Sequence, residues 1–308
     1  MAEIKRFGSE TLDEKKRPDT VALGIGGAGR NILTSMKGDV SLTNMKKYEV
    51  GVTERLPDHP FIEVSMADMK GTYESGLDVG KRPMNETEKK IGRRVQGADI
   101  LYLISGLGGE TGSITSYACS QIGNSNKSFT IALLALPFKT ESPDRWEFAL
   151  EAQEKIAEYA DIVAVFANSK LMKINPYLPM TQAFDVMNSI IRMPVEDFNT
   201  VITAEDIPHL KRFCDGVDEF RIGAGYGKGR ERGKRACAEA FRSPWLEDID
   251  DYKTVLTVVT SGKGLAEMEA EDALSGIQEK VPGADIMWGL RKDLGIGNRT
   301  KVTVLAGK

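Results

Sequence analysis

The chain has 308 residues, of which 41% are hydrophobic, enough for one large domain or two smaller ones with real cores. Its formal net charge of −4 gives no electrostatic reason to expect a nucleic-acid partner. Three cysteines without metal-ligand spacing and only two histidines argue against a zinc site or a histidine-based triad. Because we find neither a signal peptide nor an apolar run of membrane-span length, we expect a cytoplasmic protein that does not insert into membranes.

The first part of the chain predicts an extension followed by a strand, a turn and a helix. Residues 1–19 are rich in charged side chains and predict a mobile or peripheral extension. The apolar run Val21–Leu23 leads into a glycine-rich turn at Gly24–Asn31, and Ile32, Leu33 and Met36 continue with helical spacing. Taken alone, this arrangement is typical of the first strand, turn and helix of a dinucleotide-binding fold.

The next segment contains a short strand, a glycine-rich stretch and a helix. Phe61–Asp68 predicts a strand that leads into a loop, and residues 71–83 predict a flexible stretch. Asn85–Val95 predicts a helix that begins with a capping box, because Asn85 is followed three residues later by Glu88.

A second glycine-rich turn, Ser105–Ser113, follows the apolar run Ile100–Ile104 and precedes another helical pattern. Glycine allows backbone N–H groups to face an anion, and a helix N-terminus adds unpaired donors and a positive partial charge. One such turn is equally compatible with an ordinary strand-to-helix connection. Two such turns at strand ends favour a polyphosphate held between two helix N-termini, although neither contains the Gly-Lys-Ser/Thr sequence of a P-loop.

The two turns together resemble those of the tubulin/FtsZ superfamily of GTP-binding proteins, and FtsZ more than tubulin. The matching patterns are Gly-x-Gly-Gly-x-Gly-x-Asn at 24–31 and Gly-x-Gly-Gly-x-Thr-Gly-Ser at 106–113, and the resemblance extends from about Val21 to the end of the chain. It implies an α/β fold with a doubly wound, mostly parallel sheet, a long central helix and a second, smaller α/β domain. The implied parts are an N-terminal extension at 1–19, a nucleotide-binding domain at 20–179, the central helix at 180–202 and a C-terminal domain at 203–308.

The resemblance also implies which residues contact the phosphates and the ribose of GTP or GDP. Glu141 and Arg145 lie in a Pro-Phe-x-x-Glu-x-x-x-Arg pattern after the buried strand 129–136 and would reach the ribose and phosphates. The alternative is that these two side chains, four residues apart at a helix start, pair with each other. The implied phosphate contacts are Gly26, Gly27, Ala28, Gly29, Arg30, Asn31, Gly106, Leu107, Gly108, Gly109, Glu110, Thr111, Gly112 and Ser113.

The base contacts implied by the resemblance come from two later elements. Asn168 follows the strand Asp161–Ala167 and would read the guanine edge, because an amide offers a donor and an acceptor together. Phe184 and Asn188, on the long helix, would stack on the base and provide a second polar contact. The alternative for Phe184 is an ordinary core position.

Two features of the candidate site depart from the family pattern. Only Thr203–Asp206 connects the long helix to the next element. In the family this connection is a longer acidic loop that enters the nucleotide site of the next subunit. Glu205 and Asp206 either position water there or cap the following helix. Glu110 replaces a glycine and either favours GDP, recruits Mg²⁺ or points away. Asp68, by contrast, lies where the family usually has an Asp in a loop beside the phosphates; it is either that residue, acting through Mg²⁺, or a surface turn residue.

The C-terminal part resembles the family's activation domain, and this resemblance implies a mostly parallel sheet with helices. Gly223–Gly229 is interpreted as a backbone turn before a helix around 236–241 rather than as a third phosphate loop. Further strands are expected at 254–260, near 284–288 and at 300–305, with a helix at 265–281. The chain stops at Lys308, where FtsZ proteins usually continue, so we expect an FtsZ-like protein that lacks the C-terminal tail, with an unknown adaptor.

The leading hypothesis is a guanine-nucleotide-binding, FtsZ-like protein that assembles head to tail, with slow or absent GTP hydrolysis and with Mg²⁺ bound beside GTP. The alternative is a non-polymerising GTP/GDP-binding scaffold or regulator, which the short 203–206 connection favours. A Rossmann-type dehydrogenase would rest on the first glycine-rich turn alone.

Overall fold

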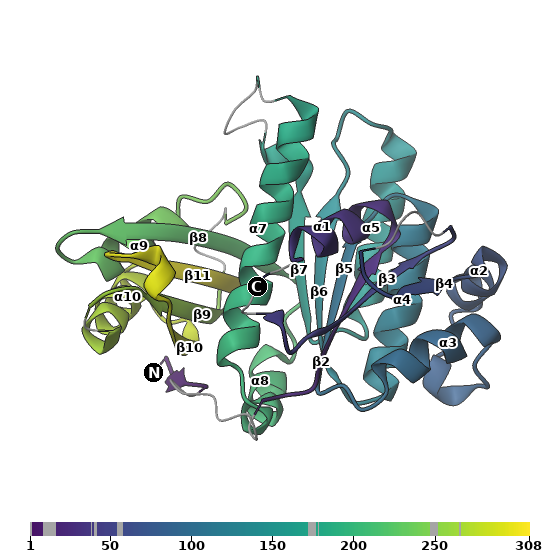
Figure 1. Cartoon of the computed structure of the whole chain (residues 1–308), viewed down its shortest axis with the longest axis horizontal. Helices are drawn as coiled ribbons and strands as arrows, with labels where there is room; N and C mark the ends of the chain where they lie inside the picture. Colours follow the sequence, from purple (N-terminus) through teal and green to yellow (C-terminus); the bar gives the residue numbers. More distant parts are fainter. Residues whose placement is uncertain are drawn as a thin grey trace. The chain divides into compact units, whose positions relative to one another are not determined.

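The structure of the chain is a computed structural model that describes residues 2–8, 17–37, 39, 42–53, 58–171, 177, 179–246, 252–264 and 266–308. It forms two compact units, one from Pro18–Arg192 and one from Met193–Lys308 together with Met1–Arg17 (Figure 1). The division between the units falls inside the long helix α7 (Met180–Val201). This helix lies where the sequence predicts one, within a residue at its C-terminal end.

The Pro18–Arg192 unit contains a parallel sheet, as the alternating strands and helices predict. Its strands run in the order β7-β6-β5-β2-β3-β4, and every neighbouring pair is parallel. The direction of winding changes between β2 and β5, which places the topological switch point of the sheet at these two strands. The strands are β2 (Thr20–Ile25), β3 (Lys46–Gly51), β4 (Phe61–Glu63), β5 (Ile100–Gly106), β6 (Phe129–Leu136) and β7 (Ile162–Ala167).

Helices cover both faces of this sheet. Alternate strand residues such as Leu103 share one core with α2 (Met66–Ser75), α3 (Glu86–Val95), α4 (Glu110–Ser125) and α5 (Pro143–Ala157). Helix α1 (Gly26–Ser35) packs on the other face, so closely that a Cβ on Gly29 would lie 2.0 Å from the carbonyl oxygen of Ile104. Only glycine permits this approach, which fixes the start of α1 against β5.

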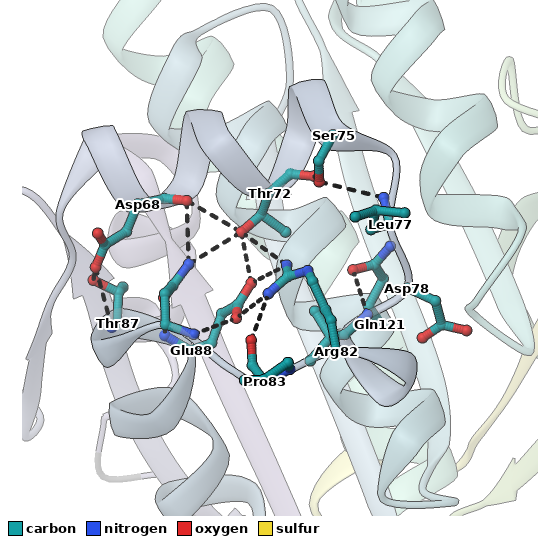
Figure 2. Close-up of polar contacts among 12 residues, drawn as sticks. Asp68, Thr72, Ser75, Leu77, Asp78, Arg82, Pro83, Thr87, Glu88 and Gln121 are labelled. Carbon is teal, nitrogen blue, oxygen red and sulfur yellow. Dashed lines mark hydrogen bonds and ion pairs between the residues drawn. The ribbon is translucent and has the colours of Figure 1, made fainter.

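The segment between β4 and α3 differs from the prediction. The expected loop and flexible stretch are instead helix α2 and a 3₁₀ turn, η3 (Val79–Lys81). Figure 2 shows why: the carboxylate of Glu88 accepts hydrogen bonds from Thr72, at 2.6 Å, and from both terminal nitrogens of Arg82. The predicted capping box between Asn85 and Glu88 is confirmed and belongs to the same network. Contacts across the chain therefore order a stretch that its glycines alone predict to be flexible.

The second unit contains a mixed sheet with the strand order β1-β10-β9-β11-β8. Strands β1, β10 and β9 are parallel, whereas β11 runs antiparallel to both β9 and β8. The sheet is thus less parallel than predicted, because the short 293–298 connection cannot return to the other end of the sheet before β11 begins. Residues 4–6 of the predicted extension form an edge strand. The strands are β1 (Ile4–Arg6), β8 (Phe220–Lys228), β9 (Thr254–Ser261), β10 (Asp285–Lys292) and β11 (Arg299–Gly307).

The predicted turn at Gly223–Gly229 is wrong, since most of these residues belong to strand β8. Helix α9 (Arg232–Ala240) crosses this strand closely: a Cβ on Gly223 would lie 2.3 Å from a backbone oxygen of α9, and one on Gly227 would lie 1.8 Å from another. The glycines therefore serve helix packing and form no phosphate loop. Helix α10 (Ala266–Lys280) shares the core of this face with α9.

The C-terminal half of α7 is anchored to the second sheet by a buried charge. Asp197 is fully buried and accepts a hydrogen bond from Thr303 at 2.6 Å, while Arg291 and Lys301 each lie 2.8 Å from its carboxylate. A short 3₁₀ turn, η5 (Ala204–Asp206), then leads into α8 (Ile207–Cys214). Among the described residues, none of the helices combines the length and apolar character that a bilayer crossing requires.

Candidate functional site

The two glycine-rich turns meet at the carboxyl ends of β2 and β5. These strands are neighbours, with Ile25 in register with Ser105, and α1 and α4 begin directly after their turns. A Cβ on Gly26, which has a φ of +68°, would lie 3.3 Å from the backbone nitrogen of Gly112. The amino ends of both helices, with their unpaired N–H groups and positive partial charges, therefore lie side by side at the switch point of the sheet.

The second turn is shaped by close backbone approaches and by its own serine. A Cβ on Gly112 would lie 2.0 Å from the carbonyl oxygen of Gly106, and Gly108 has a φ of +88°. The buried hydroxyl of Ser113 accepts a hydrogen bond from the backbone N–H of Gly108 at 3.0 Å. Ser113 thus holds the turn in shape, and Leu107 is buried in the core below it.

A cavity of about 530 Å³ opens beside the start of α1. Nothing lies within 4 Å of the position that a Cβ on Gly27 would occupy, and Gly27, Ala28 and Asn31 are exposed. This open space next to two helix amino ends suits an anion. The residues that line the cavity are Gly26, Gly27, Arg30, Asn31, Thr34, Glu49, Gly51, Val52, Thr53, Asp58 and Thr111.

Among the described residues that line this cavity, Arg30 is the cation, and it is held by strand β3. Its Nε donates to Glu49 at 2.8 Å and its Nη1 donates to the carbonyl oxygen of Thr53 at 3.1 Å. The guanidinium also lies over the ring of Phe61, 5.1 Å from the centroid. Glu49 is 2% exposed and additionally accepts from the backbone of Asp58, so Arg30 is fixed in place at the edge of the space.

Glu110 is the first residue of α4 and pairs with a lysine from α2. Its carboxylate lies 2.8 Å from the ammonium group of Lys70. Both side chains line a second cavity of about 500 Å³ on this side of the turn, together with Gly108 and Arg145. The sequence left three possibilities for Glu110: it favours GDP, recruits Mg²⁺ or points away from the phosphates. The structure instead shows its carboxylate paired with the ammonium group of Lys70.

Glu141 and Arg145 pair with each other, at 2.6 Å between carboxylate and guanidinium. Each also has a backbone contact: Glu141 accepts from the N–H of Phe138 at 2.9 Å, and Nε of Arg145 donates to the carbonyl oxygen of Gly108 at 3.3 Å. The pairing of Glu141 with Arg145 that the sequence offered as an alternative therefore exists. Arg145 also holds the glycine-rich turn in place through its hydrogen bond to Gly108. Of the two side chains, that of Arg145 lines the cavity of about 500 Å³.

The three residues expected at the base end come from the turn that follows β7 and from α7. Asn168 begins the 3₁₀ turn η4 (Asn168–Lys170), and its Oδ1 is buried without a hydrogen-bond partner among the described residues. Phe184 is 48% exposed and meets Phe138 edge to face, with ring centroids 6.3 Å apart. Asn188 is half-buried one helical turn later. A buried amide oxygen without a partner and an exposed aromatic ring are the features that a bound base would satisfy.

Asp68 lies in the first turn of α2 rather than in a loop, so the predicted location was wrong. Its carboxylate accepts from the hydroxyl of Thr87 at 2.7 Å and from the backbone N–H of the same residue at 3.3 Å (Figure 2). Asp68 therefore joins α2 to α3. In the part of the chain that the structure describes, no group of three or more His, Cys, Asp or Glu side chains is arranged to hold a metal ion.

Glu205 and Asp206 belong to the second unit. Asp206 caps η5, because its carboxylate accepts from the backbone N–H and the hydroxyl of Thr203, and it also accepts from the N–H of Gly8 at 3.1 Å. Glu205 is exposed. The capping role that the sequence offered as an alternative thus describes Asp206 in this structure, at η5 rather than at α8.

Comparison with known proteins agrees with this arrangement. The family description "Tubulin/FtsZ family, GTPase domain" matches residues 61–176, and "FtsZ family, C-terminal domain" matches residues 219–308. The chain belongs to the tubulin/FtsZ family. The GTPase domain of this family makes it a GTP-binding protein. It is 28% identical to a cell division protein FtsZ from Methanothermobacter thermautotrophicus, over 99% of this chain and 82% of that protein. It is 27% identical to cell division protein FtsZ 1 from Methanocaldococcus jannaschii, over 96% and 84%.

Solved structures of the family share the fold. An FtsZ dimer from M. jannaschii superposes with a TM-score of 0.81 at 24% identity and covers 96% of this chain and 89% of that one. CetZ2 from Haloferax volcanii, described as a GTPγS-bound protofilament, superposes with a TM-score of 0.71 at 15% identity and covers 94% and 93%. The doubly wound sheet and the second α/β unit predicted from the sequence are thus confirmed as the fold of this family.

Sequence reasoning missed two residues beside the family's glycine turns. Glu49 fixes Arg30, and Lys70 pairs with Glu110 from 40 residues away. The one signal in the sequence was Glu110 itself, since a carboxylate directly after the glycines of a phosphate-binding turn needs a cation nearby.

Proposed function

We propose that this member of the tubulin/FtsZ family holds the phosphates of GTP or GDP between the amino ends of α1 and α4. The observation that supports this most strongly is the approach of Gly26 to the backbone of Gly112, which brings two sets of unpaired N–H donors to one point. The first turn would offer the unpaired backbone donors of Gly26–Ala28 at the start of α1, and the second would offer those of Gly109–Gly112 together with the hydroxyl of Thr111. Mg²⁺ would accompany GTP, held mainly by phosphate oxygens and water.

The ribose and the base would be contacted by residues that follow strands β6 and β7 and by residues of α7. Glu141 and Arg145 would exchange part of their mutual pairing for the sugar and phosphates. Asn168 and Asn188 would read the guanine edge, with Phe184 against the ring. The partnerless Oδ1 of Asn168 supports this assignment, because a guanine N–H would supply the donor that the buried oxygen lacks.

We further propose that the chain assembles head to tail and that its GTP hydrolysis is slow. A dimer and a protofilament among the solved relatives support assembly. Slow hydrolysis is expected because Asp206, one of the two carboxylates available to position water in a neighbouring subunit, is engaged in three hydrogen bonds. Glu205, which is exposed, would then be the residue that positions water.

A second function is favoured by that same engagement of Asp206: a GTP/GDP-binding scaffold or regulator that does not polymerise. In this case nucleotide binding persists while intersubunit chemistry is absent. Sedimentation with GTP separates the two functions, because a polymer pellets and a monomer remains in the supernatant.

The decisive experiment is phosphate release from GTP and Mg²⁺ over a wide range of protein concentration, for the wild type and for Glu205→Ala/Asp206→Ala. A rate per molecule that rises with concentration and collapses in the variant supports a hydrolysing polymer. Tight GTP binding without turnover or pelleting supports the scaffold. Failure of the wild type to bind either GTP or GDP would refute both.

A further inference from the structure

The ion pair between Lys70 and Glu110 lies at a position where a negative charge is expected to weaken nucleotide binding. Glu110 is the first residue of α4 and follows the N-cap residue Gly109. A carboxylate there interacts favourably with the positive end of the helix, and so competes with a phosphate for the same partial charge. Without a cation nearby, it would also repel a terminal phosphate.

Lys70 supplies that cation from a different element. Its ammonium group lies 2.8 Å from the carboxylate of Glu110, and the side chains of Lys70 and Glu110 are 42% and 61% exposed. Both line the cavity of about 500 Å³ next to Gly108 and Arg145, so the ammonium group faces the turn and remains accessible to a ligand. A lysine ammonium on a flexible four-carbon stem can change partner without moving its backbone.

The helix that carries Lys70 is held by the network shown in Figure 2. Asp68 and Thr72, one helical turn apart on α2, bond to Thr87 and Glu88 of α3. Lys70 lies between them in sequence and points to the other side of α2, toward α4. Because α2 is fixed on both sides of Lys70, the movement open to this residue is that of its side chain.

We propose that Lys70 binds the terminal phosphate of GTP, exchanging its carboxylate partner for the phosphate, and that the Lys70–Glu110 pair thereby sets the preference between GTP and GDP. This inference rests on the proposed nucleotide site. A terminal phosphate carries more negative charge than a carboxylate, so it attracts the ammonium group more strongly. With GDP, Lys70 stays on Glu110; with GTP, it bridges to the added phosphate.

The test measures the affinity of nucleotide-free protein for GDP and for a non-hydrolysable GTP analogue by calorimetry. Lys70→Ala should weaken binding of the GTP analogue about tenfold, as for loss of a charge-assisted hydrogen bond, and should change GDP affinity far less. Glu110→Ala should tighten binding of the GTP analogue, because a repelling charge is removed. Lys89→Ala is the matched control, since Lys89 forms a similar exposed pair with Glu86 on α3 and should leave both affinities unchanged.

The double variant Lys70→Ala/Glu110→Ala separates two possible roles of Lys70: direct contact with the terminal phosphate, and neutralisation of the Glu110 charge alone. If Lys70 touches phosphate, the double variant binds the GTP analogue about tenfold more weakly than Glu110→Ala alone. If the double variant equals Glu110→Ala, or if Lys70→Ala weakens GDP and the GTP analogue alike, the inference is overturned while the proposed function stands. Absence of any guanine-nucleotide binding by the wild type would instead refute the proposed function itself.

Discussion

The carboxylate of Asp206 accepts hydrogen bonds from the backbone N–H of Thr203 at 2.8 Å and from its hydroxyl at 2.6 Å. This is a helix cap, a structural task that differs from orienting water in a neighbouring subunit. The two tasks make different predictions, because a cap contributes to folding of the monomer whether or not nucleotide is present.

Asp206→Ala is therefore expected to lower the free energy of unfolding of nucleotide-free protein by about 1 kcal/mol, as for loss of other caps. Urea unfolding measures it. Glu205→Ala, a change of an exposed neighbour, is the matched control and should have a smaller effect. Equal stability of the wild type and Asp206→Ala would show that the cap contributes little to folding. Asp206 would then again be a candidate for positioning the water that attacks GTP.

Gly27 offers a way to block the phosphate site without disturbing the fold. Since nothing lies within 4 Å of the Cβ position at Gly27, Gly27→Ala should keep both stability and GDP affinity near wild type. Gly27→Trp should fold as well but should weaken GDP binding at least about tenfold, because the indole fills the space proposed for the phosphates. Thermal unfolding and GDP titration of both variants check this, and a Trp variant with full GDP affinity would contradict the placement.

The parts of the fold that the sequence predicted are those with local causes. The glycine turns, the buried apolar strands and the capping box of α3 depend on residues close together in the chain. The parts that it missed depend on distant contacts. Helix α2 and η3 are ordered by Glu88 and Arg82, and the glycines of β8 are required by the close packing of α9. The role of Lys70 was not predicted for the same reason: Lys70 and Glu110 are 40 residues apart in the sequence, and only the fold brings them together.

Asn168 tests the base end of the site. Its buried Oδ1 has no partner among the described residues, so the N1–H or the 2-amino group of guanine would satisfy it. Adenine in the same orientation would present an unprotonated N1 and no 2-amino group, and would leave the oxygen without a donor. Asn168→Ala should weaken GDP binding about tenfold or more and reduce the preference for GDP over ADP. Competition titrations with both nucleotides measure the ratio. Ser169→Ala, at the adjacent half-buried position, is the control and should retain the wild-type ratio.

The network around Glu88 predicts how stability depends on pH. Burial alone would raise the pKa of the Glu88 carboxyl, but hydrogen bonds from Arg82, Thr72 and the backbone of Asn85 together lower this pKa below its usual value of 4.5. A group whose pKa is lower in the folded state stabilises the fold above its unfolded pKa, and this contribution is lost as the pH falls through the folded pKa. The stabilisation should therefore be complete near neutral pH and should decline below about pH 4.5.

Glu88→Gln isolates this contribution. At neutral pH the variant should be less stable by about 3 kcal/mol, because Arg82 loses its charged partner in a mostly buried setting. The difference between wild type and variant should shrink as the pH is lowered below about 4.5, since the wild-type carboxyl then becomes neutral as well. Urea unfolding of both proteins across this range measures it. Glu86→Gln, at the exposed first turn of the same helix, should have little effect on stability. A wild-type advantage over Glu88→Gln that is the same at every pH would mean that shape, rather than the charge of Glu88, orders the segment between α2 and α3.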